Sequence, residues 1–387
     1  MAKYAIFVPP AHGHVNPTLG VAAELVDRGE DVVYVAAEQF RESIEFTGAR
    51  LKAHADPPTP DPTVAGPAAL FAMLAEVGRE VQPWLSPWLA AEKPDLVLAD
   101  PMALWGHREA DRQGISVNGS YVSYMGTTLT SAVLASASAK QMMDAITASP
   151  GYADFTKVFG TQANYPFEAF EREDRTGISF MPREFHPQGA NIGEEVAFTG
   201  PAIRPRAYTG DFPLEKVEAG NTLFISLGTV FNNQTEFFRS CFEAFADLPW
   251  TVVLSHGFRV DPAELGPAPA NFLLAPSVPQ LPVLERSRLF ITHGGMNSTM
   301  EALWYGVPLV VVPQMPEQAL TSRRVAELGL GAALDPSAIT AEKLAAAVRT
   351  IDTEPSYADN VAEMRKHCHD AGGASKAADV LMKRARY

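Results

Sequence analysis

The sequence is poor in features that mark several classes of protein. Its 387 residues include only two cysteines, Cys241 and Cys368, which provide neither a disulfide framework nor a metal quartet. Lys and Arg total 31 against 45 Asp and Glu, a formal net charge of −14, whereas nucleic-acid binding favours a basic surface. No apolar run is long enough to span a bilayer, and no signal-peptide pattern opens the chain. We therefore expect a cytoplasmic protein with no nucleic-acid or membrane partner.

A dinucleotide-binding motif is also missing. No Gly-x-Gly-x-x-Gly follows the first predicted strand, which argues against a nicotinamide or flavin oxidoreductase. What remains is a composition typical of globular proteins, with 47% hydrophobic and 20% charged residues. The length is sufficient for two domains of ordinary size.

The opening of the chain predicts a β-α-β unit. Tyr4–Val8 is a short apolar strand, and Asp31–Ala36 is a second one. Between them we expect a helix with Asn16 as its N-cap and Pro17 in its first turn, where a missing N–H costs nothing. A β-α-β opening predicts a parallel sheet with right-handed crossovers.

The same alternation begins again in the second half of the chain. Pro201–Gly220 is rich in proline, glycine and charged residues and is the best candidate for a linker. Thr222–Leu227 then reads as the first strand of a new series. We predict two doubly wound α/β domains.

The segment Arg288–Pro308 has the features of a nucleotide site. It predicts a strand, then the turn His293-Gly294-Gly295, then a helix over Asn297–Tyr305. Glycine lets the backbone approach a ligand closely, and the N-terminus of a helix attracts phosphate. Asn297 and Ser298 add side-chain donors, and Glu301 shares their helix face, where its carboxylate is able to accept hydrogen bonds from sugar hydroxyls.

The order and spacing of these motifs resemble a known family. The matching residues are Val278-Pro279-Gln280, His293-Gly294-Gly295, Asn297-Ser298, Glu301, Gly306-Val307-Pro308 and Glu317-Gln318. They resemble the nucleotide-sugar signature of GT-B glycosyltransferases, in particular the bacterial macrolide and natural-product branch, over nearly the whole chain.

The resemblance implies a fold and a domain plan. It implies a GT-B fold of two Rossmann-like domains facing a cleft. We expect an acceptor-binding domain at 1–205, a linker at 206–220, a donor-binding domain at 221–372 and a terminal helical segment at 373–387 packing on the first domain.

The resemblance also implies which residues bind the nucleotide sugar. The donor phosphates, nucleobase and sugar are expected to contact Gly228, Thr229, Val278, Gln280, His293, Gly294, Gly295, Asn297, Ser298, Glu301, Glu317 and Gln318. Ser277 stands where plant members carry a stacking tryptophan, and Glu317 where many relatives have Asp. A bare strand-to-loop turn is an equally good interpretation of Gly228-Thr229 without the resemblance, and a solvated helix N-terminus is the alternative for Glu317.

His14 is the candidate general base, and Asp100 its partner. In the family a histidine at this place takes the acceptor proton, and histidine titrates near neutrality. Asp100 ends a predicted strand of the same sheet and so lies within reach of that loop. Without the resemblance, a lone loop histidine is usually structural and Asp100 before Pro101 is a turn residue. Nothing completes a metal set around His12, which we interpret as structural.

These assignments predict an inverting, metal-independent O-glycosyltransferase with no cofactor. UDP-glucose is the expected donor, and the chain contains no Asp-x-Asp for a divalent ion. The acceptor is a small hydrophobic molecule such as a macrolide, a flavonoid or another phenol, bound by residues between Pro60 and Phe180. A sugar-nucleotide epimerase of GT-B shape and a non-catalytic helper are the alternatives. The oligomeric state cannot be inferred.

Overall fold

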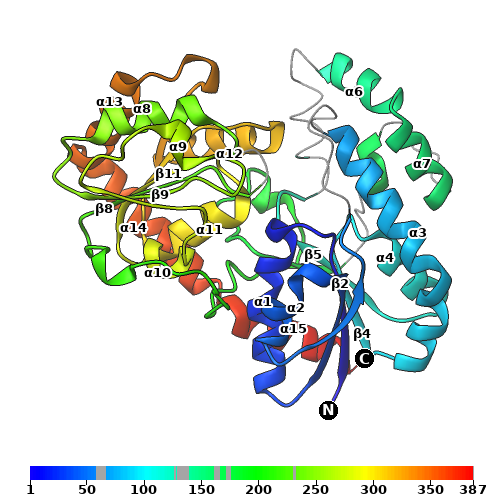
Figure 1. Cartoon of the computed structure of the whole chain (residues 1–387). Coiled ribbons are helices and arrows are strands. Elements are labelled where there is room, and N and C mark those ends of the chain that lie inside the picture. Colours follow the sequence, from blue (N-terminus) through cyan, green and yellow to red (C-terminus); the bar gives the residue numbers. More distant parts are fainter. Residues whose placement is uncertain are drawn as a thin grey trace. The chain divides into compact units, whose positions relative to one another are not determined.

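The structure is a computed structural model, and it divides the chain into two compact units (Figure 1). Unit 1 comprises Met1–Ala207 and Ala371–Tyr387, and unit 2 comprises Tyr208–Asp370. The residues that the structure describes are 1–57, 67–125, 128, 139–160, 166–170, 176–229 and 232–386.

The division assigns the predicted linker and the predicted terminal helical segment to the two units. The boundary after Ala207 falls inside the predicted linker, residues 206–220, and residues 208–220 are grouped with unit 2. There Phe212 and Val217 are buried. The terminal helix α15 (Gly373–Arg384) is grouped with unit 1, where Arg28, the C-cap of α1 (His12–Asp27), pairs with Asp379 at 2.6 Å.

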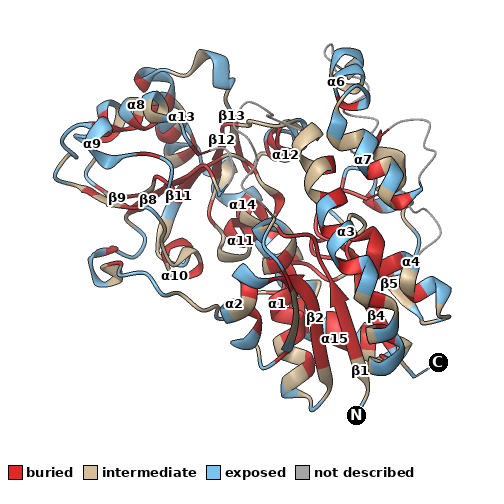
Figure 2. Cartoon of the chain, turned by 45° about the vertical axis from the view of Figure 1, so that its right-hand side comes forward, coloured by how far each residue is buried: buried red, intermediate tan, exposed pale blue. Residues whose placement is uncertain are grey.

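A parallel sheet forms the centre of unit 1. Its seven strands lie in the order β3-β2-β1-β4-β5-β6-β7 among the residues described. Their bounds are β1 (Lys3–Phe7), β2 (Asp31–Ala37), β3 (Arg50–His54), β4 (Leu96–Ala99), β5 (Val117–Tyr121), β6 (Gly177–Ser179) and β7 (Val196–Phe198). Apolar side chains fill the central strands, which Figure 2 shows as buried in β1, β2 and β4. Such nearly continuous apolar runs are typical of strands covered on both faces.

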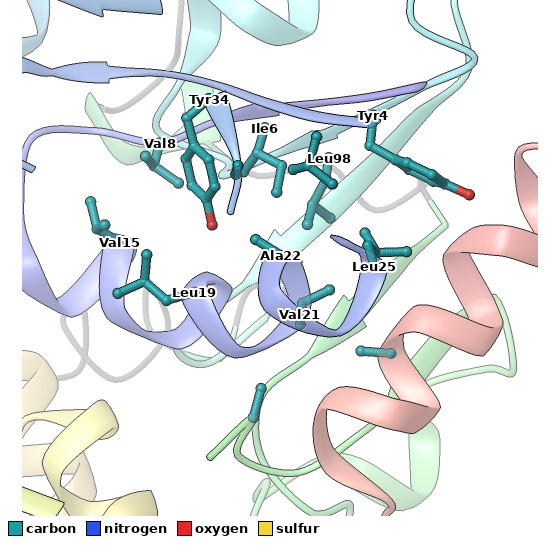
Figure 3. Close-up of a cluster of buried hydrophobic side chains, with 14 of the residues drawn as sticks. Tyr4, Ile6, Val8, Val15, Leu19, Val21, Ala22, Leu25, Tyr34 and Leu98 are labelled. Atoms are coloured by element: carbon teal, nitrogen blue, oxygen red, sulfur yellow. The ribbon is translucent and has the colours of Figure 1, made fainter. Parts of the chain in front are cut away.

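Helices cover the two faces of this sheet. One buried cluster joins the sheet to α1 and α15, and Figure 3 shows Val15, Leu19 and Ala22 of α1 directed at the strands. The second cluster joins the other face to further helices. Among the residues described, the further α-helices of unit 1 are α2 (Arg41–Glu45), α3 (Pro67–Glu92), α4 (Leu104–Arg112), α6 (Ala139–Thr147) and α7 (Pro150–Phe159).

Several aromatic and methionine residues within the Pro60–Phe180 region belong to the interior of unit 1. Five of them, between residues 121 and 159, are buried: Tyr121, Tyr124, Met125, Phe155 and Phe159. Parts of the Pro60–Phe180 region predicted to bind the acceptor, including Pro60 itself, lie outside the described residues.

The start of α1 differs from the prediction. The helix begins at His12, so Asn16 is not its N-cap and Pro17 lies inside it. The carbonyl of Ala11 accepts hydrogen bonds from the N–H groups of His14 and Val15 at 2.9 and 3.1 Å, and these bonds start the helix one turn early. Pro17 removes a single hydrogen bond from the ladder. His14 therefore stands in the first turn of a helix and not in the preceding loop.

Unit 2 is built on a second parallel sheet. Within its described residues, six strands lie in the order β10-β9-β8-β11-β12-β13. Their bounds are β8 (Thr222–Ser226), β9 (Thr251–Ser255), β10 (Phe272–Ala275), β11 (Ser287–Thr292), β12 (Leu309–Val311) and β13 (Gly331–Ala333). The helices are α8 (Thr235–Phe245), α9 (Pro262–Leu265), α10 (Gln280–Leu284), α11 (Met296–Tyr305), α12 (Pro316–Glu327), α13 (Ala341–Thr353) and α14 (Pro355–Asp370).

Each sheet reverses its strand order at one point. In unit 1 the reversal lies between β1 and β4, and in unit 2 between β8 and β11. Ligands of doubly wound α/β proteins bind beyond the carboxyl ends of the strands at such a switch point. His14 and Asp100 follow β1 and β4, whereas Gly228 and His293 follow β8 and β11. The topology therefore brings together the candidate residues within each unit.

No helix among the residues described has the length and apolar character needed to cross a membrane.

Candidate active-site residues

In unit 1, His14 and Asp100 form the hydrogen-bonded pair that the sequence predicts. His14 Nδ1 lies 2.7 Å from Asp100 Oδ2, although 86 residues separate the two in sequence. The Asp100 side chain is 1% exposed, whereas that of His14 is 22% exposed. A carboxylate oxygen accepts and does not donate, so Nδ1 carries the hydrogen. The lone pair of the neutral ring then lies on Nε2, which is the ring nitrogen able to accept a proton.

Main-chain groups orient the Asp100 carboxylate. Asp100 N–H donates to Phe7 C=O at 2.9 Å, which ties the residue to the end of β1. The N–H of Met102 donates to Asp100 Oδ1 at 2.9 Å. With Oδ1 occupied by this turn, Oδ2 is the oxygen presented to His14. Such an arrangement stabilises an imidazolium once a proton arrives, as in the serine triad.

His12 does not take part in this pair. Its ring makes an edge contact with Phe40, with ring centroids 5.0 Å apart. This contact agrees with the interpretation of His12 as structural.

In unit 2, the turn between β11 and α11 has the form of an anion site. Gly294 adopts a left-handed φ of +81°, and Gly295 caps α11 with φ −60°. The Thr292 hydroxyl accepts from Gly294 N–H at 3.3 Å. The first N–H groups of α11 have no partner within the helix, and the helix dipole favours negative charge at that end. The turn and helix together are able to bind a phosphate.

The His293 ring occupies a space that two glycines leave open. A Cβ at Gly228 would lie 2.6 Å from His293 Cε1, and a Cβ at Gly295 would lie 2.4 Å from His293 Nε2. The loops after β8 and β11 therefore approach each other across this ring. Burial lowers the pKa of His293 to about 4. The ring is neutral at pH 7 and offers a hydrogen-bond donor without a positive charge.

Polar side chains from α10 and α11 form a connected cluster. Gln280 Nε2 donates to Glu301 Oε2 at 2.5 Å and to Ser298 Oγ at 3.2 Å. Asn297 Nδ2 donates to the other oxygen, Glu301 Oε1, at 2.8 Å. Glu301 is fully buried, so both carboxylate oxygens serve to hold these amides. The predicted shared helix face of Asn297 and Glu301 is confirmed, whereas the contact of Glu301 with ribose stays a prediction.

Glu317 and Gln318 lie in the first turn of α12. Gln318 Oε1 accepts from Gln314 N–H at 2.8 Å and so closes the loop before the helix. A Cβ at Gly294 would lie 3.4 Å from the Gln318 carbonyl, which places α12 against the β11–α11 turn. Glu317 is partly exposed at this end. The pair therefore borders the predicted phosphate site, where a donor sugar would extend.

The remaining predicted donor contacts lie in loops at the same edge of the sheet. Val278 follows β10 and is partly buried, and Thr229 follows β8 and is exposed. The hydroxyl of Tyr208 donates to the Ser277 carbonyl at 3.0 Å, next to Val278. Asn232 Nδ2 donates to the Gly228 carbonyl at 2.8 Å. No local pattern of residues indicates a role for Tyr208 or Asn232, because each donates to a backbone carbonyl from a loop of irregular sequence.

Within the part of the chain that the structure describes, no group of three His, Cys, Asp or Glu side chains is placed to hold a metal ion.

The chain is similar in sequence to known proteins of one family. A family model described as UDP-glucoronosyl and UDP-glucosyl transferase matches residues 215–372. The NDP-glycosyltransferase YjiC of Bacillus licheniformis is 39% identical over 97% of this chain and 96% of its own length. The demethyllactenocin mycarosyltransferase of Streptomyces fradiae is 33% identical over 98% of this chain and 86% of its own.

Solved structures are similar over the same length. The glycotransferase of kitacinnamycin superposes with a TM-score of 0.82 at 28% identity, covering 99% of both chains. CalG4, the calicheamicin glycosyltransferase, gives a TM-score of 0.76 at 27% identity, covering 99% of this chain and 98% of its own.

Proposed function

Because this chain belongs to the bacterial natural-product glycosyltransferases of the UDP-glucosyl transferase family, with the GT-B fold, we propose that it moves glucose from UDP-glucose to a hydroxyl of a hydrophobic acceptor. Membership makes it a sugar-transferring enzyme that uses a nucleotide-diphosphate sugar and a small-molecule acceptor. The identity of the sugar, the nucleobase and the acceptor, and the course of the reaction, are the proposal.

The observation that carries the mechanism is the His14–Asp100 pair, with 2.7 Å between Nδ1 and Oδ2 at the switch point of unit 1. His14 Nε2 takes the proton of the acceptor hydroxyl as its oxygen bonds to the anomeric carbon. The bond from that carbon to the phosphate oxygen breaks, and UDP leaves with the electron pair. Asp100 stabilises the imidazolium that forms, and the proton then passes to solvent. General-base help of this kind contributes about 10²- to 10⁴-fold in rate.

Attack comes from the face opposite the departing diphosphate, so an α-linked donor gives a β-glycoside. The charge that develops on the diphosphate would be stabilised by the N-terminus of α11, the Gly294–Gly295 turn and the neutral His293 ring. These donors stand where a divalent cation would otherwise neutralise the diphosphate, and we propose a metal-independent reaction on that ground. We propose UDP and not TDP as the nucleotide, with Val278 beneath the nucleobase. Ser277 provides no aromatic surface on which the base could stack.

A macrolide is the acceptor that we propose first. Two relatives are named for transfer involving related compounds, the demethyllactenocin mycarosyltransferase and the oleandomycin glycosyltransferase of Streptomyces antibioticus, the latter 30% identical over 98% of this chain. Flavonoids and other phenols are the second class, since they are also flat or wide apolar molecules with reactive hydroxyls. The comparisons give no support to an epimerase or a non-catalytic helper.

The test is incubation of the purified protein with UDP-glucose and a panel of macrolides, flavonoids and simple phenols. Mass spectrometry should find a product heavier by one hexose, and proton NMR of the product should show a β-linkage. A parallel reaction with TDP-glucose sets the nucleobase preference. An isomerised donor without a glycoside, or an α-linked product, would contradict the proposal.

A further inference from the structure

A second histidine lies behind the His14–Asp100 pair. His107, in α4, is 1% exposed, and its Nε2 lies 2.7 Å from the main-chain carbonyl oxygen of Asp100. Since a carbonyl accepts and does not donate, Nε2 carries the hydrogen and is the donor. The same carbonyl accepts a second hydrogen bond, from Ala103 N–H at 2.8 Å.

Close packing brings His107 to this position. Gly106 lies against the ring of Phe7, and a Cβ there would lie 2.4 Å from Phe7 Cγ. Without a side chain at Gly106, α4 approaches the end of β1 closely enough for the next residue to reach the Asp100 carbonyl. Phe7 in turn accepts from Asp100 N–H. The end of β1, the start of α4 and the turn at Asp100 are therefore held as one rigid corner.

We propose that His107 is a positioning residue for sugar transfer, since it holds the Asp100 main chain so that Oδ2 meets His14 Nδ1. This inference rests on the proposed function, in which His14 is the base. The Asp100 carboxylate is oriented from its own backbone: Oδ1 is occupied by Met102 N–H, and the direction of Oδ2 follows from the turn. Removing the His107 donor leaves one hydrogen bond on a carbonyl that had two.

A shift of the Asp100 main chain after loss of the His107 hydrogen bond would displace the Asp100 carboxylate, which contacts His14. Asp100 has two rotatable bonds, so a small rotation of its peptide changes the position of Oδ2. A displacement of about 1 Å in a catalytic group can cost 10²-fold in rate. A donor replaced by a group that cannot reach would also leave a buried carbonyl less well satisfied.

Two amide substitutions separate this role from simple burial of a polar ring. In His107→Gln the amide Nε2 stands as many bonds from Cα as the imidazole Nε2, so it can donate to the same carbonyl. In His107→Asn the amide is one bond shorter and cannot reach it. Both variants place a polar amide in the same buried site, so they share the general cost of changing that site.

Each variant is measured in two ways. Turnover and KM for UDP-glucose are determined across a range of pH, and the His14 ring is followed by ¹⁵N NMR of histidine-labelled protein. We expect His107→Asn to lower kcat about 10- to 100-fold with KM changed less than about twofold, and to weaken the Nδ1–H form of His14. His107→Gln should keep kcat within about threefold and leave the His14 signal as it is.

Three outcomes distinguish the proposals. Equal loss in Gln and Asn variants, or a lowered Tm with kcat and the His14 signal unchanged in both, would overturn the positioning role. A changed His14 signal in His107→Asn with turnover intact would support positioning and overturn the assignment of His14 as base. If His107→Gln retains both the His14 NMR signal and kcat while His107→Asn loses both, the result supports the positioning role of His107 and the assignment of His14 as the base.

Discussion

Replacing Gly228 by alanine tests how the phosphate site of unit 2 is assembled. Gly228 has a φ of +78°, and a Cβ there would meet His293 Cε1 at 2.6 Å, roughly 1 Å inside ordinary contact distance. The ring has to move out of its place between Gly228 and Gly295. If His293 donates to the donor diphosphate, the variant loses one hydrogen bond to a charged group, worth about 1.5–3 kcal/mol. That corresponds to roughly 10- to 150-fold weaker binding of UDP.

The matched control is Gly220→Ala in the same unit. Gly220 has a φ of +73°, but a Cβ there meets nothing within 4 Å. Both variants place alanine at a positive φ, at a cost of about 1–2 kcal/mol. Only Gly228→Ala should lose affinity for UDP, measured by isothermal titration calorimetry. Equal affinities in the two variants would refute the placement of His293 beside the diphosphate.

Further predictions concern charge and protonation. Asp100→Asn should lower single-turnover transfer about 10²- to 10⁴-fold with UDP affinity unchanged, because His14 loses the acceptor that sets its tautomer; a normal rate would remove Asp100 from the mechanism. The folded pKa of His293, about 4, lies below the ordinary value of 6.5, so the unfolded chain binds more protons between these values. The free energy of unfolding should therefore decrease as the pH drops from about 6.5 towards 4, with His293 accounting for at most about 3 kcal/mol of the decrease. Urea unfolding of His293→Asn should show a smaller decrease over the same pH range. A chelator such as EDTA should leave the transfer rate unchanged, whereas inactivation restored by Mg²⁺ would contradict metal independence.

Much of the fold could be predicted because its signals are local. Apolar strands, glycine stops and alternating helices are properties of short segments, and together they predict two parallel sheets. The turn at His293–Gly295 was equally local, since strand, glycines and helix follow each other directly. The left-handed φ of Gly306, +75°, confirms the helix stop expected there.

Other features depend on contacts that no short segment contains. Proline at position 17 suggested a helix N-terminus, but the Ala11 carbonyl starts α1 earlier, and the helix tolerates the proline. The His14–Asp100 pair joins two strands that become neighbours only through the order of the sheet, so the family resemblance predicted it better than spacing did. His107 donates to the main-chain carbonyl of Asp100 because Gly106 packs closely against Phe7. No sequence pattern predicts such a contact.

In the proposed mechanism His14 performs the proton transfer, and unit 2 binds the nucleotide. The most direct test is His14→Ala, compared with the unchanged protein in single-turnover transfer from saturating UDP-glucose and in calorimetric titration with UDP. We expect a transfer rate at least about 10²-fold lower, with the Kd for UDP unchanged within about twofold. A variant that transfers normally, or one that loses UDP binding in step with its rate, would contradict it.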